Sequence, residues 1–451
     1  MSEWGEMRIG DYADTFAGGT PDRGDESLFG GSIPWIKSTE VNLGRIKETE
    51  EFLSEKGLQT SAAKWIPANS VLVAMYGATA AQIAYLEIEA TANQAVLAIC
   101  PREQLDSLFL YYALTSAKHR LLFLAQGSGQ PNLNKQIVDR FEVPAPLPPQ
   151  QRRIATILTT LDEVIEATEK LVEKHQQIKA GLMHDLFTRG LWTRPELARG
   201  DHKGTPAEAT AQEGQLRPPP EEAPGLYQDS PLGLIPIAWE TTTIGACLQG
   251  IDSGKSPECP EIPATSDQWG VLKVGAVHPD GFRAIENKVV LNAALRNPAF
   301  LVATGDLLIS RANTFELVGL SCHVTTETGN LMLSDKTLRL RPSTTRMTTR
   351  FMFWTLQTNK SRRQIENSAS GTSGSMKNIS QNGIRGIACV RPGLDEQEKI
   401  TERMDSLLSD INTQNTHLAK LRQQKQGLMH DLLTGRVRVD VPSSATVPAE
   451  S

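Results

Sequence analysis

The segment Gly250–Ser256, GIDSGKS, comes nearest in this chain to a phosphate-binding loop of the kind that holds a nucleotide. A loop of that kind has four residues between its first glycine and its Gly-Lys pair. Here only three residues separate Gly250 from Gly254, and no hydrophobic strand leads into the segment. The segment therefore does not predict a nucleotide site.

Motifs for other catalytic sites are missing as well. The chain has no GxSxG, no HExxH and no Cys/His cluster with zinc spacing. His184 and His430 are each followed by an aspartate, Asp185 and Asp431, a pairing that suggests acid–base chemistry. Adjacent residues of a helix, however, point about 100° apart and do not face each other. We therefore expect a structural or partner-contact role for them, and no catalytic residue, cofactor or metal site in the chain.

Two loops rich in Gly, Ser and Asn suit a different chemistry: AQGSGQPNLNK at Ala125–Lys135 and NSASGTSGSMKN at Asn367–Asn378. Small residues let backbone N–H groups approach a phosphate, and Asn or Gln side chains can pair with the edge of an adenine. A flexible connecting loop explains this composition equally well. The candidate DNA-contact residues here are Gln126, Ser128, Gln130, Asn132, Ser370, Thr372, Ser373, Lys377 and Asn378.

A second pair of candidate loops follows two apolar, strand-like runs: MYGATAAQ at Met75–Gln82 and SRANTFE at Ser310–Glu316. Arg311 is the best single candidate for contact with guanine, which arginine can bind with two hydrogen bonds. A phosphate contact or a plain surface position is the alternative for Arg311. The other candidates, in these loops and near the beginning of each half, are Tyr76, Thr79, Asn313, Lys37, Ser38, Thr39 and Lys273.

The chain contains an internal repeat. The string GLMHDL occurs at Gly181–Leu186 and again at Gly427–Leu432, an offset of 246 residues. At the same offset Asn132 lies opposite Asn378, whereas near the beginning of each half the offset is 236, so about ten residues are inserted in the second copy. We therefore expect each half to be one globular unit followed by one long helix.

Apolar residues at alternating steps of three and four predict a long helix at the end of each half, as in the seam of a coiled coil. Each helix would have ~38 residues and a length of ~57 Å, and a strip that long needs an equally long partner. We expect the two helices to pair as an antiparallel coiled coil; two amphipathic helices packed on their own domains are the alternative. The expected seam and partner-binding residues are Ile154, Leu158, Leu161, Ile165, Leu182, Leu186, Ile400, Met404, Leu407, Ile411, Leu428 and Leu432.

Short apolar runs separated by Gly, Asn and Pro, with one helix in each half, predict an α+β fold of two strand-rich domains in tandem. The segment between the halves is rich in Pro, Ala, Gly and Glu without hydrophobic periodicity, which predicts an exposed linker. The expected parts are strand-rich domains at 1–149 and 227–393, long helices at 150–190 and 394–437, the linker at 191–226 and a disordered tail at 438–451.

Composition and charge limit the class of protein. The 451 residues are 39% hydrophobic and 22% charged, with five scattered cysteines and no apolar stretch long enough to cross a bilayer, which predicts a cytoplasmic globular protein of two or three domains. Residues 1–149 carry 12 basic and 18 acidic residues, whereas residues 227–392 carry 17 basic and 13 acidic ones. Because DNA affinity comes largely from neutralising phosphates, the acidic first half would need a partner to supply many of the contacts with DNA phosphates.

The tandem of strand-rich unit and long helix, with GSGQPNLNKQIV leading into VPAPLPPQQRRIATIL, resembles the specificity subunits of type I restriction–modification systems. The segments SVLVAMYGATAAQI, DSPLGLIPIAWE and GLMHDLLTG are similar to hallmarks of that family, and the resemblance covers nearly the whole chain. It implies two target-recognition domains that each read one part of a split site in double-stranded DNA through the major groove. It also implies that the helices bind two methyltransferase subunits, which would bring S-adenosylmethionine, and that two motor–nuclease subunits would bring ATP and magnesium.

Two features depart from the family pattern. The second copy has PGLDEQEKI where the first has PLPPQQRRI, and the linker is long and rich in proline. A coiled-coil scaffold that binds only protein is the main alternative, although it would not explain two elaborate globular units. A free-standing DNA-modifying enzyme is a third interpretation, which no catalytic motif supports. We expect a DNA-reading subunit without chemistry of its own, and the sequence does not reveal the bases it would read.

Overall fold

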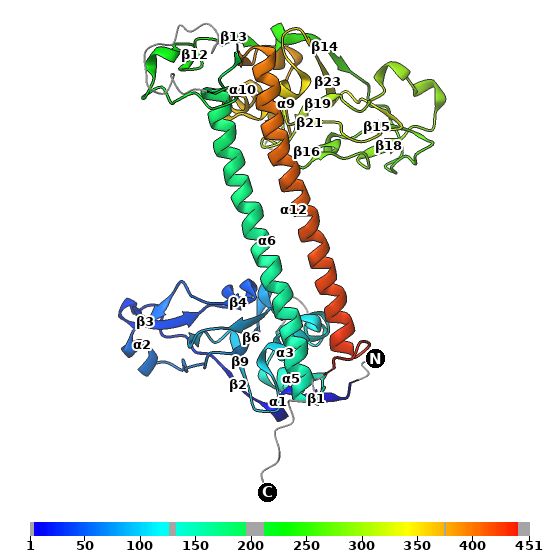
Figure 1. The fold of residues 1–451 in the computed structure, drawn as a ribbon. Coiled ribbons are helices and arrows are strands. Elements are labelled where there is room, and N and C mark those ends of the chain that lie inside the picture. The colour runs from blue at the N-terminus through cyan, green and yellow to red at the C-terminus, as the bar shows by residue number, and fades with distance from the viewer. Residues whose placement is uncertain (1–3, 126–131, 195–211, 374–375, 441–451) are drawn as a thin grey trace. The chain divides into compact units, whose positions relative to one another are not determined.

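The computed structural model describes residues 4–125, 132–194, 212–373 and 376–440, and the chain forms two compact units (Figure 1). Unit 1 comprises the described parts of residues 1–171 and 414–451, and unit 2 comprises those of residues 172–413. Both units contain helices and strands, so the expected mixed fold is confirmed. Each long helix contributes one part to unit 1 and its other part to unit 2.

The main sheet of unit 1 has five strands in the order β2 (Ala13–Ala17), β9 (Val96–Pro101), β6 (Ser70–Ala74), β7 (Ile83–Leu86) and β4 (Arg45–Ile46). Every residue of the central β6 is buried. Successive side chains of a strand point to opposite faces. Val71 and Val73 accordingly enter one hydrophobic cluster, while Leu72 and Ala74 enter another. The continuous apolar run SVLVA thus belongs to a strand that is covered on both faces.

Helices cover the face of this sheet that carries Val71 and Val73. Helix α3 (Ser107–Ser116) begins where the Asp106 carboxylate accepts a hydrogen bond from the Phe109 N–H, a typical N-terminal cap. The ends of both long helices add residues to the same cluster. The remaining helices and strands of unit 1 are α1 (Ile9–Tyr12), α2 (Glu55–Gln59), α3 (Ser107–Ser116), α4 (Lys118–Phe123), α5 (Lys135–Asp139), the sheet of β5 (Phe52–Leu53), β3 (Phe29–Ile36) and β8 (Thr91–Ala92), and the pair β1 (Glu6–Arg8) and β10 (Glu142–Pro144).

Unit 2 repeats this design. Its main sheet has the order β14 (Leu248–Ser253), β23 (Thr337–Pro342), β19 (Leu307–Ser310) and β21 (Ser321–His323). The residues of β19 are all buried and alternate as in β6, because Leu307 and Ile309 enter one hydrophobic cluster and Leu308 enters another. A strand covered on both faces therefore stands at the equivalent place of each unit.

The other elements of unit 2 include two helices that follow the main sheet in chain order, as α3 and α4 do in unit 1. These elements are α9 (Thr349–Gln357), α10 (Asn359–Ser368), α11 (Gln381–Arg385), the sheets β18 (Asn287–Val289), β15 (Trp269–Leu272), β22 (Asn330–Met332) and β20 (Ala312–Asn313), β25 (Met376–Asn378), β24 (Ser370–Ser373), and the pairs β13 (Glu240–Thr243) with β26 (Ala388–Arg391), β16 (Val277–His278) with β17 (Gly281–Phe282), and β11 (Tyr227–Gln228) with β12 (Ile235–Pro236).

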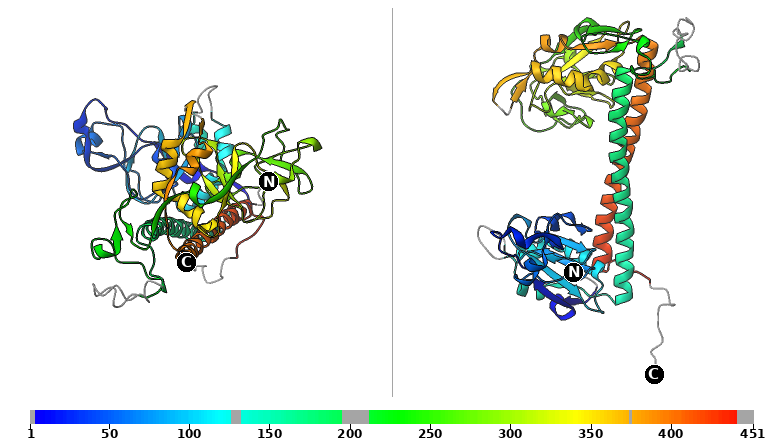
Figure 2. Two further views of the ribbon diagram at one scale, coloured as in Figure 1. Left: turned by 90° about the horizontal axis from the view of Figure 1, so that it is seen from above. Right: turned by 90° about the vertical axis from the view of Figure 1, so that its left-hand side faces the viewer.

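The two long helices are α6 (Pro148–Thr188) and α12 (Leu394–Thr434), each with 41 residues, and both can be followed from end to end in Figure 2. Proline at the first position of α6 suits a helix start, because the first N–H groups of a helix have no partner within it. Among the helices in the described ranges, none has both the length and the apolar composition needed to cross a bilayer.

In unit 1 the first part of α6 packs on the last part of α12. A small apolar cluster lies between them, made of Leu161, Ile165, Leu418 and Leu421. One ion pair joins Asp162 to Lys425, with 2.5 Å between Oδ1 and Nζ, and a more exposed pair joins Glu169 to Arg422. Residue numbers rise along α6 as they fall along α12, so the two segments run antiparallel within unit 1.

In unit 2 the last part of α6 and the first part of α12 join the hydrophobic core of the domain. The same cluster contains Leu186 of α6 and Ile400 and Met404 of α12. Helix packing on the domain cores, the alternative raised by the sequence, therefore operates at the helix ends. The buried members of the expected seam are Ile154, Leu158, Ile165, Leu186, Ile400, Met404, Ile411 and Leu432; Leu161, Leu182 and Leu407 are half-buried, and Leu428 is exposed.

The linker expected at 191–226 is not exposed throughout. Trp192 and Arg217 are almost fully buried, and Ala223 and Leu226 are buried as well. The prediction of exposure was wrong for these residues, because a few anchoring side chains among many prolines leave no periodic pattern. Of the expected tail at 438–451, residues 441–451 lie outside the described residues.

The buried Glu396 carboxylate near the beginning of α12 holds this segment. Its oxygens accept hydrogen bonds from the Leu191 N–H at 2.7 Å, the Arg217 guanidinium at 2.7 Å and the Trp239 indole at 2.9 Å. Glu396 and Arg217 are 2% and 1% exposed, so neither charge can be compensated by water. Their pairing ties three segments that are distant in the sequence.

Replacing Glu396 with glutamine should strongly destabilise unit 2, because it leaves the Arg217 charge buried without a carboxylate. The expected loss in the free energy of unfolding is about 3 kcal/mol or more. Denaturant-induced unfolding of the full chain measures it. The matched control is Arg422→Gln, which breaks the exposed pair with Glu169 and should cost less than about 1 kcal/mol. Equal, small effects of the two variants would contradict the anchoring role of Glu396.

Candidate nucleic-acid interface

The loop that follows β6 in unit 1 is closed by backbone hydrogen bonds. The Ala74 N–H donates to the Gln82 carbonyl at 3.0 Å, and the Ala81 N–H donates to the Ala74 carbonyl at 2.9 Å. A short 3-10 turn at Gly77–Thr79 lies between them. Tyr76 is 41% exposed, so the loop presents an aromatic ring to the solvent.

This loop lies beside the segment rich in Gly, Ser and Asn. Tyr76 and Asn132 form an isolated antiparallel bridge, and the Leu133 N–H donates to the Met75 carbonyl at 2.8 Å. Asn132 is exposed, whereas Leu133 is buried in the core. The structure thus brings together Tyr76 and Asn132, candidates that belong to different loops. Thr79 lies in the same loop as Tyr76, and Gln126, Ser128 and Gln130 lie outside the described residues.

The corresponding loops of unit 2 are paired in the same way. β20 follows β19 directly and pairs with β25, so that Ala312 lies opposite Asn378 and Asn313 lies opposite Lys377. The bridge between residues 312 and 378 repeats that between 76 and 132, at the offsets of 236 and 246 that relate the two halves of the sequence. β24 pairs with the other edge of β25 and carries the candidates Ser370, Thr372 and Ser373.

Arg311 lies where three segments of unit 2 meet. Its N–H donates to the Lys336 carbonyl at 2.8 Å, and its own carbonyl accepts from the Ile379 N–H at 2.9 Å. One guanidinium nitrogen donates weakly to the Asp335 carbonyl at 3.4 Å. The Nε atom is buried without a hydrogen-bond partner in the described part of the chain. The backbone of Arg311 is therefore fixed on both sides, while its guanidinium keeps donors available for a ligand.

Two more cations lie on the segments around Arg311, and sequence reasoning missed them as binding residues. Lys336 follows Asp335, and Lys255 precedes Ser256, whose hydroxyl donates to the Asp335 carboxylate. Both lysines are exposed. The Gly-Lys pair in GIDSGKS contains Lys255, and a glycine before a lysine is a sequence signal for phosphate contact even without a complete nucleotide loop.

The equivalent backbone positions are neutral in unit 1. The Met75 N–H donates to the Ala95 carbonyl at 2.8 Å, just as the Arg311 N–H donates to the Lys336 carbonyl. The offset of 236 between Met75 and Arg311 also places Gly19 opposite Lys255. Unit 2 therefore has three cations at positions where unit 1 has none, which accounts for part of the charge difference between the two halves.

Lys37 and Lys273, expected as DNA contacts, are paired with carboxylates. The Lys37 Nζ lies 2.8 Å from Glu50 and 3.3 Å from Glu51, and the hydrogen bond to Glu50 raises the pKa of Lys37. The Lys273 Nζ lies 3.2 Å from Glu261. Both follow strands of the small sheets, β3 and β15, and Ser38 and Thr39 come directly after Lys37. Among the described residues, no strand pairing joins β3 or β15 to the paired loops.

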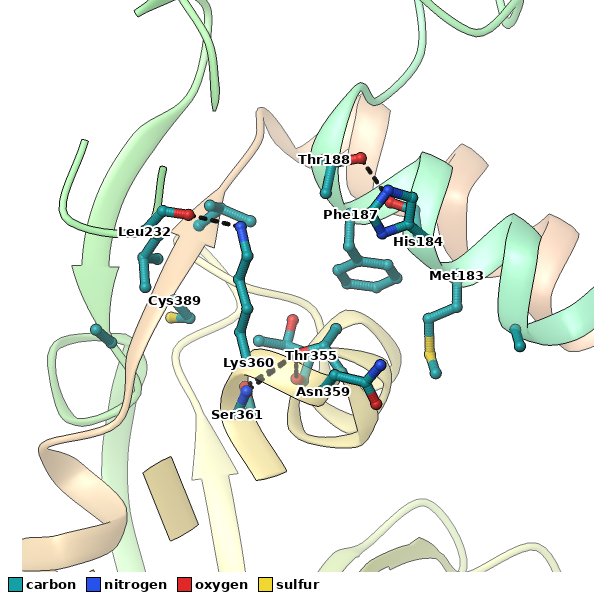
Figure 3. Close-up of a pocket in the computed structure, with 14 residues that line it drawn as sticks. Met183, His184, Phe187, Thr188, Leu232, Thr355, Asn359, Lys360, Ser361 and Cys389 are labelled. Atoms are coloured by element: carbon teal, nitrogen blue, oxygen red, sulfur yellow. Dashed lines mark hydrogen bonds between the residues drawn. The ribbon is translucent and has the colours of Figure 1, made fainter. Parts of the chain in front are cut away.

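Met183 and His184, from the first copy of the Met-His-Asp triplet, line a pocket in unit 2 (Figure 3). The pocket has a volume of about 140 Å³, and its walls include Met183 and His184 of α6 and Cys389 of β26. The Lys360 ammonium donates to the Leu232 carbonyl at 2.6 Å, and burial lowers the pKa of Lys360. The walls are thus partly apolar, and this lysine is held by a main-chain group.

His184 and its neighbour Asp185 have different surroundings. His184 lines the pocket, whereas the Asp185 carboxylate lies 3.4 Å from the Arg189 guanidinium. This separation is what the geometry of a helix predicts for adjacent residues. In the described ranges, no group of three His, Cys, Asp or Glu side chains is placed to hold a metal ion.

Comparisons with known sequences find similarity to type I restriction enzyme specificity subunits. The family model described as "Type I restriction modification DNA specificity domain" matches residues 1–179. The type I restriction enzyme EcoEI specificity subunit of Escherichia coli is 32% identical over 224 residues, which are 49% of this chain and 37% of that protein. The MjaVIII specificity subunit of Methanocaldococcus jannaschii is 21% identical over 443 residues, 97% of this chain and 93% of the relative. The match thus spans just over a third of the first relative and nearly all of the second.

Solved structures share the fold. The type I restriction-modification S subunit from M. genitalium aligns with a TM-score of 0.59 at 14% identity, covering 96% of both chains. A chain from a study of complex assembly and conformational transition of the type I R-M system aligns with a TM-score of 0.51 at 15% identity, covering 96% of this chain and 98% of that one. In sequence and in fold, the chain is similar to the specificity subunits of type I restriction–modification systems.

Proposed function

We infer that this chain is the DNA-specificity subunit of a type I restriction–modification enzyme and reads a split DNA site, one part with each unit. One observation carries the proposal: the bridge between two polar loops occurs twice, at Tyr76–Asn132 and at Ala312–Asn378. The backbone pairing is the same in both copies, but the side chains differ. Such a pair of surfaces suits the reading of two different half-sites, and the relatives named as specificity subunits support the same role.

Each unit would contact base edges in the major groove, where every base pair has its own pattern of donors and acceptors. We propose that Arg311 contacts guanine and that Lys255 and Lys336 contact phosphates beside it. The other proposed DNA-contact residues are Tyr76, Thr79, Gln126, Ser128, Gln130, Asn132, Asn313, Ser370, Thr372, Ser373, Lys377 and Asn378. Lys37, Ser38, Thr39 and Lys273 rank below them, because carboxylates neutralise the two lysines.

The proposed architecture is a tandem of target-recognition domains with spacer helices. Residues 1–149 and 227–393 would be the two recognition domains, 150–190 and 394–437 the spacer helices, and 191–226 the connection. We propose that the helices form an antiparallel coiled coil that sets the distance between the two half-sites. The apolar cluster and the ion pairs between α6 and α12 in unit 1 support this pairing.

The chemistry of the complex would come from its partners. We propose that two methyltransferase subunits supply S-adenosylmethionine, and that two motor–nuclease subunits supply ATP and magnesium. Val164, Leu171 and Ile178 of α6 stand seven residues apart and are all exposed, which suits an apolar seam with a partner helix. This role would place the chain, without catalysis of its own, beside chromosomal DNA in the cytoplasm.

A protein scaffold without DNA recognition, the alternative from the sequence, is not favoured, because the relatives are named as specificity subunits.

The complex with its methyltransferase partner should enrich two short motifs at one fixed spacing from a pool of random DNA. The chain alone should bind more weakly, because its first half is acidic and needs the partner for contact with phosphates. Sequencing of the bound DNA after several rounds measures both motifs and their gap. If the complete complex enriches no sequence, the proposed function is wrong.

The double variant Lys255→Gln/Lys336→Gln should weaken DNA binding about equally for all sequences. Each lost phosphate contact should reduce the slope of log K against log salt by about 0.9, so the double variant should lose about 1.8. Titration of the complex at several salt concentrations measures the slope. The matched control is Lys37→Gln, which should change the slope little because Glu50 and Glu51 already neutralise Lys37. A larger effect of the control would contradict the assignment.

Removal of one heptad from each long helix, residues 169–175 of α6 and 412–418 of α12, should shorten the gap between the motifs. Seven residues of helix rise about 10 Å, which corresponds to about 3 base pairs of DNA. Removing whole heptads keeps the apolar register. The control is the same deletion in α6 alone, which should abolish the fixed spacing. An unchanged gap in the double deletion would show that the helices do not set the spacing.

A further inference from the structure

In unit 1 a cation on helix α4 holds the loop that joins β6 to β7. Lys118 is the first residue of α4, and its Nζ donates to the Gln82 side-chain oxygen at 2.7 Å. Gln82 is the last residue of the loop, and its backbone carbonyl accepts the hydrogen bond from the Ala74 N–H that closes it. Lys118 therefore connects the helix to the base of the loop that contains Tyr76.

In unit 2 a cation on α10 holds the loop that joins β19 to β21. The Arg362 guanidinium donates to the Val318 carbonyl at 3.0 Å and to the Glu316 carbonyl at 3.2 Å. Burial lowers the pKa of Arg362, yet a guanidinium stays charged at neutral pH. A half-buried charge that is bound to main-chain oxygens fixes the course of the loop, because those oxygens cannot rotate independently of the backbone.

The loop of unit 2 also touches α10 directly. Gly319 has a φ of +67°, and a Cβ atom at this position would lie 2.4 Å from the Ile365 Cγ2. Only glycine allows the helix to approach the backbone so closely. Apolar contact and the Arg362 hydrogen bonds thus hold the loop to the same face of α10.

The same helix leads into the second candidate loop of each unit. α10 ends at Ser368 and is followed by β24, which begins at Ser370. α4 ends at Phe123, and the chain then leads to Asn132, the partner of Tyr76 in the bridge. One helix in each unit therefore holds the loop after the central strand and precedes the second candidate loop in the chain.

We propose that Lys118 and Arg362 are positioning residues that keep the loop after the central strand of their own unit, β6 or β19, in one fixed arrangement, and so determine how sharply that unit reads its half-site. This inference rests on the proposed function. Recognition of base edges requires donors and acceptors held within about 0.5 Å of their productive positions, which a loop attached only by its ends does not guarantee. The two cations act alike although one binds a side chain and the other binds carbonyl groups.

The test uses the complex with the methyltransferase partner and the random DNA pool. Arg362→Gln should reduce the preference for one of the two motifs by about tenfold, the effect of a mismatched base pair, and should leave the other motif unchanged. Lys118→Met should reduce the preference for the other motif and leave the preference for the first motif unchanged. The controls are Arg363→Gln and His119→Gln, exposed neighbours on the same helices that should leave both motifs intact.

Conservative variants separate positioning from general support of the fold. Lys118→Arg keeps a cation that can reach one side-chain oxygen, so this variant should keep the full preference for its motif. Arg362→Lys can hold only one of the two carbonyls, so this variant should keep only part of the preference for its motif. Assembly with the methyltransferase, measured by gel filtration, should be unchanged in all variants. The inference is overturned if Arg362→Gln and Lys118→Met both keep the preference for both motifs. It is also overturned if either variant loses the preference for both motifs or fails to assemble with the methyltransferase. If the unmodified complex enriches no motif, the proposed function itself fails, and the inference fails with it.

Discussion

The central strand of each main sheet, β6 in unit 1 and β19 in unit 2, is buried on both faces, and the candidate interface depends on this burial. A strand whose alternate side chains enter two different clusters cannot shift by one residue without exchanging them. The loop after the strand therefore starts from a fixed point, and the second loop pairs with it through backbone groups. Backbone pairing does not require particular side chains, so Tyr76 and Ala312 can occupy equivalent places and present different surfaces.

The two units differ in charge at equivalent backbone positions of the candidate interface. Arg311, Lys255 and Lys336 lie on adjoining segments in unit 2, where Met75, Gly19 and Ala95 stand in unit 1. The net charge of −6 for the whole chain conceals this difference, because it adds an acidic half to a basic one. In the proposed complex, the second unit would supply more of its own phosphate contacts than the first.

Charged side chains that are buried, as Glu396 is, or half-buried, as Arg362 is, also connect segments that are far apart in the sequence. Glu396 holds Arg217, Trp239 and the Leu191 N–H together at the beginning of α12, and Arg362 holds the loop after β19. A buried charge is costly unless its partners surround it, so each of these groups selects one arrangement of the neighbouring chain. These charges act together with apolar contacts, such as the cluster of Trp192, Ala223, Leu226 and Tyr227 and the approach of Gly319 to Ile365.

The sequence by itself determined the internal repeat, the mixed fold, the two long helices and the pairs of polar loops, because these follow from local patterns: identical strings at a constant offset, heptad spacing and short apolar runs. It also assigned Lys37 and Lys273 to the same class as Arg311, and it described residues 191–226 as exposed. Only the tertiary structure decided these points. Glu50 and Glu261 neutralise the two lysines, and the buried Arg217 pairs with the buried Glu396. Tyr76 forms a β-bridge with Asn132, which lies 56 residues further along the chain. Contacts between distant residues depend on how the sheets and helices pack, and no local pattern of residue types records them.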